Sequence, residues 1–193
     1  MGKRATRVRL RRQMRTAGAL YDEGGYAEAE ALLRHLMPEY DEALGADDRE
    51  SIDLRDMLGS VLFQQRKLAE SATLHGEATR RAARVLGPDD PATLGFAHNY
   101  GAALAVLGST SEALAVLQDT LERRVRLLGG AHEDTLHTAN TLGSTLFTMG
   151  AVPEGLDLLR QAHAASLRLP ENHPLRQDIA GNLRVAQRNS GGW

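Results

Sequence analysis

The stretch LGPDDPATLGFAHNYGAALAVLG, residues 86–108, contains the signals that decide the fold. Asp90 is placed to cap a helix, and Pro91 suits the first helical turn, where a missing N–H costs nothing. Apolar and small residues then recur at helical spacing as far as Leu104. Gly108 is suited to end the helix, because glycine accepts the left-handed backbone conformation past a helix terminus. The stretch therefore predicts one helix that ends just before this glycine.

A second helix is expected directly after the first. Ser109 and Glu112 have the spacing of a capping box, in which each side chain bonds a free backbone N–H of the first turn. The acidic group also complements the positive end of the helix dipole. Apolar residues such as Leu117 then follow at helical spacing until Gly129. Residues 90–129 therefore predict a helical hairpin.

This hairpin pattern repeats along the chain at an interval of 42 residues. Three rows that define the interval are Leu20, Leu62, Leu104 and Leu146; Glu28, Glu70, Glu112 and Glu154; and the small residues Ala17, Gly59, Gly101 and Gly143. A further row consists of Gly24, Gly108 and Gly150, and Arg66 takes this position in the second unit. A mid-helix glycine costs about 1 kcal/mol relative to alanine. Close approach of the two helices of each hairpin would account for a small residue in every repeat.

The repeat predicts an all-α protein of about four helical hairpins plus a C-terminal capping helix. The units cover about residues 6–47, 48–89, 90–131 and 132–173, and the capping helix covers 174–189. One apolar stripe on that last helix consists of Leu175, Ile179, Leu183 and Ala186. We expect residues 1–189 to form a single domain and residues 190–193, SGGW, to form a flexible tail.

The repeats resemble the tetratricopeptide motif, in its longer form found in kinesin light chains and their bacterial relatives. The resemblance is carried by residues 86–108 and by LGGAHEDTLHTANTLGSTLF, residues 128–147, and it covers roughly residues 10–170. HEAT and armadillo repeats have a similar length, but the placement of the small residues fits the tetratricopeptide pattern better. The resemblance implies a right-handed α-solenoid. Arg66 and His75 are departures from the pattern in the second unit.

The resemblance also implies a concave inner wall made by the first helices of successive units. Its candidate peptide-binding residues are Asp53, Asp56, Phe63, Gln64, His98, Asn99, His137, Asn140, Ser144, Phe147 and Thr148, with Ser60 beside them and Arg11, Met14, Gly18 and Tyr21 in the first unit. Related repeats use asparagines on this wall to bind a peptide backbone, which suits a side chain with both donors and acceptors. The aromatic residues would add apolar contact, and Asp53 and Asp56 would favour a basic group.

The sequence therefore predicts a non-catalytic adaptor that binds a protein or an extended peptide through its concave face. Two alternatives are a structural module that self-associates into a homo-oligomer and a regulatory sensor that binds a peptide or small ligand and acts through a partner. A solenoid creates an extended concave surface by its curvature, which favours the adaptor.

Signals for catalysis are missing from the sequence. It has no cysteine, no glycine-rich phosphate loop that ends in lysine, and no nucleophile motif. His132 and His137 are five residues apart rather than four, so they would not share one helix face as the ligands of zinc proteases do. We expect no enzyme activity, no metal and no cofactor.

Charge and hydropathy select no membrane or nucleic-acid partner. The net charge is −2, and no apolar run approaches the roughly 18 residues needed to span a membrane. We therefore expect a cytoplasmic protein. Arg4, Arg7, Arg11 and Arg15 align on one face of the first helix and could bind an acidic partner. We favour a solvated helix face that Asp53 and Asp56 partly neutralise, because nothing else in the sequence indicates nucleic-acid binding.

Overall fold

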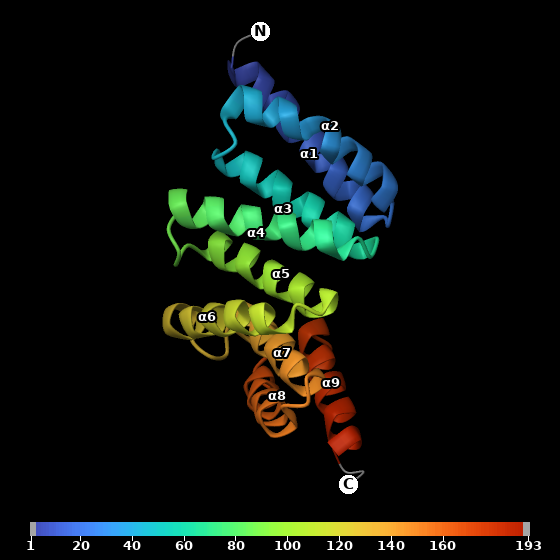
Figure 1. The fold of residues 1–193 in the computed structure, drawn as a ribbon, viewed down its shortest axis with the longest axis vertical. Coiled ribbons are helices and arrows are strands. Elements are labelled where there is room, and N and C mark those ends of the chain that lie inside the picture. Colours follow the sequence, from blue (N-terminus) through green and yellow to red (C-terminus); the bar gives the residue numbers. More distant parts are fainter. Residues whose placement is uncertain (1–2, 191–193) are drawn as a thin grey trace. The chain divides into compact units, whose positions relative to one another are not determined.

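A computed structural model describes residues 3–190 of the chain, and this part is all-α, with nine helices and no strand. The helices are α1 (Lys3–Asp22), α2 (Tyr26–Leu44), α3 (Arg49–Gln64), α4 (Leu68–Val85), α5 (Pro91–Leu107), α6 (Thr110–Leu128), α7 (Glu133–Thr148), α8 (Val152–Ser166) and α9 (Pro174–Ser190) (Figure 1). They form an α-solenoid of repeated hairpins, as predicted. The flexible tail predicted at 190–193 lies outside the described residues, apart from Ser190, which ends α9.

The helix boundaries follow the 42-residue interval. The second helices α2, α4, α6 and α8 begin at residues 26, 68, 110 and 152, and the first helices α3, α5 and α7 begin at 49, 91 and 133. The recurring glutamates, Glu28 to Glu154, all lie in the first turns of the second helices. The turns between the helices of a hairpin contain Gly24, Gly108 and Gly150 with φ between 80° and 92°. Arg66 adopts the same left-handed conformation at φ 63°, at a cost of about 1–2 kcal/mol.

The starts of the first helices are capped by side chains. The Asp48 carboxylate accepts a hydrogen bond from the Glu50 backbone N–H at 3.0 Å, and Asp90 accepts one from Ala92 at 2.9 Å. His132 Nδ1 accepts a hydrogen bond from the Asp134 backbone N–H at 3.2 Å. The predicted capping box at Ser109 is wrong, because its side chain makes no capping hydrogen bond. Its backbone ψ of 61° departs from the extended conformation that N-cap residues adopt.

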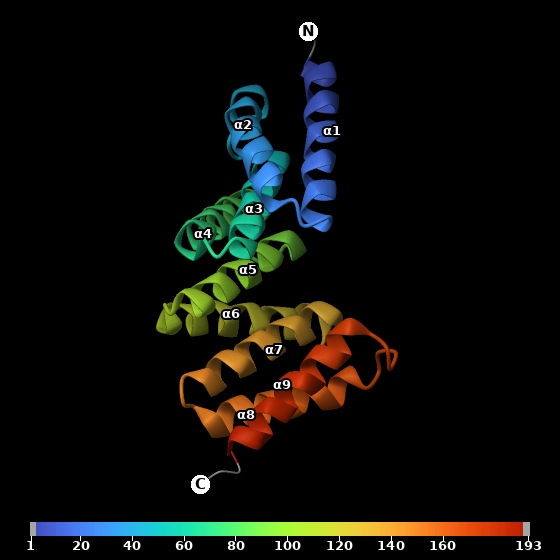
Figure 2. The same ribbon diagram turned by 90° about the vertical axis from the view of Figure 1, so that its right-hand side faces the viewer.

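The helices group into two compact units, one with α1–α5 and the other with α6–α9. In the first unit each helix packs against the next, and α3 also contacts α1 and α5 (Figure 2). Leu10, Leu33, Leu58 and Leu62 are among the fully buried residues of its core. The expectation that residues 1–189 form a single solenoid domain stays a prediction.

The small residues of the first helices, Ala17, Gly59, Gly101 and Gly143, are all buried. At Gly59 and Gly143 the second helix of the same hairpin approaches closely. A Cβ added at Gly59 would lie 2.8 Å from the His75 ring, and one added at Gly143 would lie 2.9 Å from Leu159 Cγ. The packing reason proposed for these costly mid-helix glycines is therefore confirmed for both hairpins.

In the second unit α9 closes the array by packing against α7 and α8. Its predicted apolar stripe is buried, since Leu175, Ile179, Leu183 and Ala186 are each at most 8% exposed. The opposite side of α9 contains Arg184, Gln187 and Arg188, which are exposed. This is the polar outer surface that a terminal helix of a repeat array requires.

Candidate functional site

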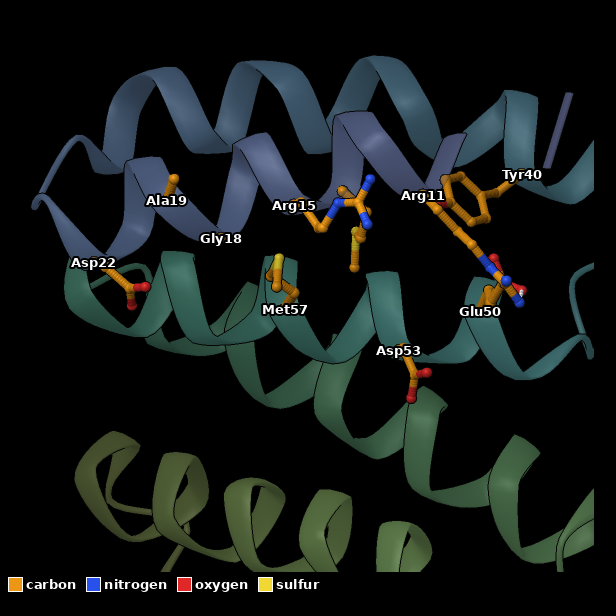
Figure 3. A pocket seen from close by; sticks show the side chains of 10 residues that line it. Arg11, Arg15, Gly18, Ala19, Asp22, Tyr40, Glu50, Asp53 and Met57 are labelled. Carbon is orange, nitrogen blue, oxygen red and sulfur yellow. Dashed lines mark hydrogen bonds and ion pairs between the residues drawn. The ribbon is translucent and has the colours of Figure 1, made fainter. Parts of the chain in front are cut away.

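Two adjoining pockets lie on the surface that the first helices of the hairpins form in the first unit. The larger, of about 630 Å³, lies between α1 and α3 (Figure 3). The smaller, of about 280 Å³, reaches Phe96 of α5. Because Met14, Asp53 and Met57 line both, the two pockets form one hollow, which we name the α1–α3 groove.

Half of the groove lining was predicted from the sequence. The predicted residues that line one or both pockets are Arg11, Met14, Gly18, Tyr21, Asp53, Asp56 and Ser60. The lining residues that were not predicted are Arg15, Ala19, Asp22, Tyr40, Glu50, Met57 and Phe96. Met57 lies two residues before the small Gly59, whereas the expected positions lie three residues before it and one and four residues after it.

Two predicted residues lie at the end of α3. Gln64 is exposed, and its Nε2 donates a hydrogen bond to the Tyr21 hydroxyl at 3.0 Å, joining α3 to α1. Phe63 is half-buried. Both residues therefore stay accessible beside the groove, although neither lines its pockets.

Asp56 is held by side chains from two other helices. Nδ1 of His75 in α4 lies 2.6 Å from its carboxylate, and Nδ2 of Asn99 in α5 donates to both oxygens at 3.1 and 3.2 Å. A carboxylate only accepts hydrogen bonds, so the His75 Nδ1 carries the proton in this contact. Asn99 thus uses its amide nitrogen to fix Asp56, and its contact with a peptide backbone stays a prediction.

Asp53 has a different environment from Asp56. Its carboxylate accepts from Arg49 Nε at 2.9 Å, and its side chain is 40% exposed. Burial raises the pKa of Asp53, while Arg49 opposes this shift. The charge of this carboxylate is therefore incompletely compensated at the wall of the groove.

The basic face of α1 is neutralised by other carboxylates than predicted. Arg7 pairs with Asp48 at 2.8 Å and with Glu50 at 2.6 Å, and Arg11 pairs with Glu50 at 2.7 Å. The expected partners Asp53 and Asp56 lie further along α3, where Arg49, His75 and Asn99 bind them. Burial raises the pKa of Glu50, but the hydrogen bonds from Arg11 and Arg7 outweigh it and lower the pKa overall.

Arg4 and Arg15 make no ion pair with the described residues, and of these two arginines Arg15 lies at the groove. The Arg15 side chain is exposed. The groove therefore combines an apolar floor of Met14 and Met57 with one unpaired cation and the Asp53 carboxylate at its edge. Such a surface can hold an apolar side chain and charged groups of both signs.

The predicted residues of α7 differ in accessibility. His137 and Thr148 are exposed, and Ser144 is half-buried. Asn140 is only 8% exposed, and its Oδ1 accepts a hydrogen bond from Asn182 of α9 at 3.0 Å. Phe147 is half-buried and packs against the apolar cluster that includes Leu156 and Leu183. The Phe147 side chain therefore contributes to the packing of the second unit.

Residues of α9 extend this surface in the second unit. A polar pocket of about 550 Å³ lies between α7 and α9, with Asn140 on one side and Gln177, Asp178, Asn182 and Arg184 on the other. Sequence reasoning treated α9 only as a cap and missed these residues. The available signal was the interval itself, since Asn182 follows Asn140 by 42 residues. Of the remaining predicted residues, His98 lies half-buried on α5 in the first unit, beside Asn99.

The described residues contain neither a metal-binding cluster nor a membrane-spanning helix. No group of three or more histidine, aspartate or glutamate side chains in this part of the chain is placed to hold a metal ion. His132 caps α7 and His137 lies within it. Within residues 3–190, no helix has both the length and the apolar character needed to cross a bilayer.

Sequence models of the tetratricopeptide repeat match residues 52–92 and 93–168, which run from the first turn of α3 to the end of α8. The chain belongs to the tetratricopeptide repeat family. No curated protein matches its sequence.

Solved structures of tetratricopeptide repeat proteins are similar to this chain throughout its length. One is a Podosopora anserina protein described as a kinesin light chain with nearly identical TPR-like repeats, at 23% identity and a TM-score of 0.82, covering 95% of this chain and 87% of that one. Another is BtubC (BKLC) from P. vanneervenii, at 18% identity and a TM-score of 0.77, covering 91% and 70%.

At these identities the similarity establishes the fold. MamA AMB-1 is a more distant neighbour, at 16% identity and a TM-score of 0.54, covering 96% of this chain and 94% of that one. Tetratricopeptide repeats support a protein-interaction adaptor in general, and their fold is typically non-catalytic.

Proposed function

We propose that this tetratricopeptide repeat protein is a non-catalytic adaptor that binds an extended segment of a partner protein along the first helices of its repeats. The observation that carries the proposal is the α1–α3 groove. Its pockets, of about 630 and 280 Å³, are lined by residues that the repeat register assigned to the inner wall. An extended chain advances about 3.3 Å per residue, so the groove suits a short segment of several residues.

The chemistry of the groove supports a peptide rather than a flat protein surface. Met14 and Met57 provide an unbranched, polarisable floor that adapts to different apolar side chains. Arg15 offers a guanidinium without an ion pair to described residues. Asp53 offers a partly exposed carboxylate that pairs with Arg49 and can also attract a cation of the partner. The Ser60 hydroxyl adds a donor and acceptor for a peptide backbone.

In the second unit, the exposed side chains of His137 and Thr148 on α7 and of Gln177 on α9 are candidates for additional polar contacts. The hydrogen bond between Asn140 and Asn182 leaves the two amide groups with further donors and acceptors. We propose that this asparagine pair binds peptide backbone groups, with Asn182 the more accessible of the two.

The test uses peptides selected from a random phage-displayed library against the full chain, with affinities measured by fluorescence anisotropy. Gly18 faces the groove, and a Cβ there would meet only Met57 Cε at 3.7 Å. Gly18→Gln therefore fills the groove without displacing backbone, and we expect it to weaken binding at least about tenfold. Gly18→Ala and Ala31→Gln, the second on the exposed side of α2, should leave affinity unchanged. Selected peptides that bind the wild type and Gly18→Gln equally well would show that the groove is not the site.

A further inference from the structure

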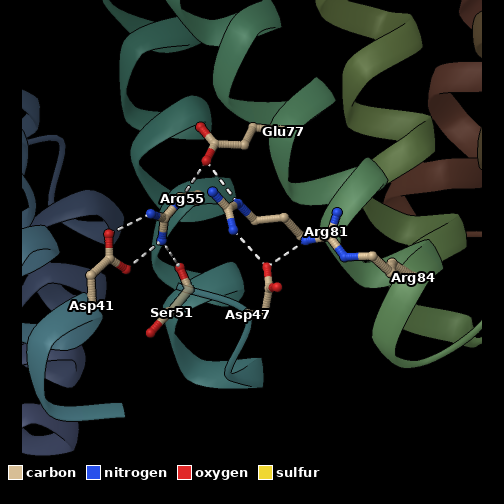
Figure 4. Close-up of polar contacts among 7 residues, drawn as sticks. All are labelled: Asp41, Asp47, Ser51, Arg55, Glu77, Arg81 and Arg84. Carbon is tan, nitrogen blue, oxygen red and sulfur yellow. Dashed lines mark hydrogen bonds and ion pairs between the residues drawn. The ribbon is translucent and has the colours of Figure 1, made fainter. Parts of the chain in front are cut away.

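A buried arginine organises an ion-pair network on the side of the second helices in the first unit (Figure 4). Arg55 of α3, whose side chain is 5% exposed, donates to Asp41 of α2 at 2.6 and 3.0 Å and to Glu77 of α4 at 3.1 Å. Arg81 bridges Glu77 at 2.8 Å to Asp47 at 2.6 Å. Arg84 completes the network with Asp47 at 2.7 Å. We name these six residues the Arg55 network.

The repeat register identifies the equivalent positions in the second unit. Helices α6 and α7 have the same bounds as α2 and α3 when 84 residues are added, and α8 begins 84 residues after α4. The counterparts of Asp41, Asp47, Arg55, Glu77, Arg81 and Arg84 are Val125, Ala131, Ala139, Gln161, Ala165 and Arg168. Five of the six charged side chains are thus replaced by uncharged ones, and three of these are alanine.

A pocket of about 480 Å³ occupies this place in the second unit. All six counterparts line it, together with apolar side chains that include Leu121 and Leu158. The long Arg55 side chain fills the corresponding space in the first unit, whereas Ala139 is too short to do so. Nothing among the described residues takes over this filling role.

The pocket has an apolar wall and one cation at its edge. Val125, in the place of Asp41, is 47% exposed. Arg168 is exposed and makes no ion pair with the described part of the chain, since Ala131 stands where Asp47 neutralises Arg84 in the first unit. The pocket therefore lacks two features of the Arg55 network: a long side chain at its centre and a carboxylate at its rim.

We propose that this pocket is a second binding site, for a partner-protein segment that presents a bulky apolar side chain next to a carboxylate. The apolar side chain fills the space that Ala139 leaves open, and the carboxylate pairs with Arg168. The loss of both central carboxylates, at Val125 and Gln161, excludes a basic side chain in the same place, because a buried cation without a partner is costly.

Within the second unit, the pocket lies on a different face from the residues of α7 that are proposed to contact a peptide. At 3.6 residues per turn, Thr135 and Ala139 are on the side of α7 opposite to His137, Ser144 and Thr148. A partner bound here would lie against α6 and α8 and leave the first-helix face free. The chain could therefore connect two proteins, which one groove alone would not permit.

The experiment uses the full chain and a fluorescein-labelled, alanine-based helical peptide with phenylalanine and, four positions later, glutamate, so that both side chains lie on one face. A second peptide has glutamine in place of the glutamate. Fluorescence anisotropy gives the affinities, and we expect the glutamate peptide to bind about two- to fivefold more tightly, as for an exposed ion pair. Equal affinities of the two peptides for the wild type, or no binding of either, would overturn the proposal.

The triple variant V125D/A139R/Q161E rebuilds the centre of the Arg55 network in the second unit and should weaken binding at least about tenfold. Arg168→Gln is an exposed change that keeps the pocket, so it should abolish only the preference for the glutamate peptide. Arg160→Gln, on the exposed side of α8, should change neither property. Unaltered binding to a triple variant with wild-type helicity would overturn the proposal.

Light scattering decides between a partner segment and a second copy of this chain. A wild-type dimer that the triple variant abolishes would show that a second copy covers the pocket and would overturn the assignment to a partner protein. The Gly18→Gln variant should bind both helical peptides with wild-type affinity. A negative result at this pocket would therefore leave the proposal for the α1–α3 groove standing.

Discussion

The imidazole ring of His75 lies directly against Gly59, so that a Cβ at position 59 would be 2.8 Å from Cε1 and 2.9 Å from both ring nitrogens. The ring is 2% exposed and its Nδ1 is fixed by Asp56, which leaves it little freedom to move. The other hairpins have Leu33, Leu117 or Leu159 at this place. Glycine at position 59 is thus matched to the particular side chain that faces it.

Gly59→Ala should destabilise the protein. Overpacking of this kind costs about 1–3 kcal/mol, which exceeds the gain of about 1 kcal/mol in helix propensity. Urea unfolding followed by circular dichroism measures the difference. Gly18→Ala is the matched control, because its nearest contact is at 3.7 Å, and it should be neutral or stabilising. Equal stability of the two alanine variants would contradict the close packing of His75.

Gly155→Ala should be more damaging than Gly59→Ala, because the obstacle is backbone rather than a side chain. A Cβ there would lie 2.7 Å from the Phe147 N atom and 2.8 Å from the Gly143 carbonyl oxygen. Helices α7 and α8 would have to separate, so we expect a loss of about 3 kcal/mol or a failure to fold. Thermal unfolding compares it with Gly181→Ala in α9, where an added Cβ would meet nothing within 4 Å beyond its chain neighbours and its own helix backbone. Similar melting temperatures for these two variants would argue against the close approach of α7 and α8.

The 42-residue interval predicted the helix boundaries and the buried small residues, because a repeated hairpin must place equivalent side chains in equivalent packing positions. It did not predict the partners of the charged side chains. Arg7 pairs with Asp48 and Glu50 rather than with Asp53 because of the relative position of α1 and α3, which cannot be read from the residue types. Ser109 failed as a cap because its backbone conformation depends on the turn before it.

The candidate site was predicted in position more than in chemistry. Asp53, Asp56 and Ser60 line the groove as expected. The amide group of Asn99, however, is taken up by Asp56, a contact between neighbouring first helices that one repeat alone does not reveal. The Arg55 network was not predicted, since an arginine in a row that otherwise contains Gln13, Ala97 and Ala139 gives no signal of its partners.

Glu30 should give the stability a measurable pH dependence. The hydrogen bond from Lys67 lowers the pKa of Glu30 to about 2, with Arg34 and Gln65 adding to the effect and burial opposing it. A folded-state pKa below the unfolded value of 4.5 means that the stabilisation is fully present above pH 4.5 and is lost as the pH falls toward 2. The shift corresponds to at most about 3 kcal/mol, and the exposed partners reduce this to about 1 kcal/mol.

The variant Glu30→Gln isolates this contribution. Urea unfolding at several pH values between 2 and 7 should show a wild-type advantage at neutral pH that shrinks on acidification. Glu28→Gln, exposed on the same helix, is the control and should follow the wild-type curve more closely. A constant difference between wild type and Glu30→Gln over the whole range would contradict the lowered pKa.

Arg55→Met tests whether the Arg55 network stabilises the first unit through charge or through filled volume. Methionine keeps most of the apolar length but removes the hydrogen bonds to Asp41, Glu77 and the Ser51 carbonyl oxygen. Removing one member of a buried ion pair costs about 3–5 kcal/mol of stability. Because Asp41 and Glu77 are about one-third exposed and can be hydrated, we expect Arg55→Met to lose about 1–3 kcal/mol. The triple variant D41V/R55M/E77Q removes both carboxylates that face Arg55, while Arg81 loses Glu77 but keeps Asp47. It should recover much of this loss, because well-packed apolar side chains replace buried ion pairs at little cost. Thermal unfolding of the two variants makes the comparison, and a triple variant less stable than Arg55→Met would mean that the carboxylates stabilise the fold independently of Arg55.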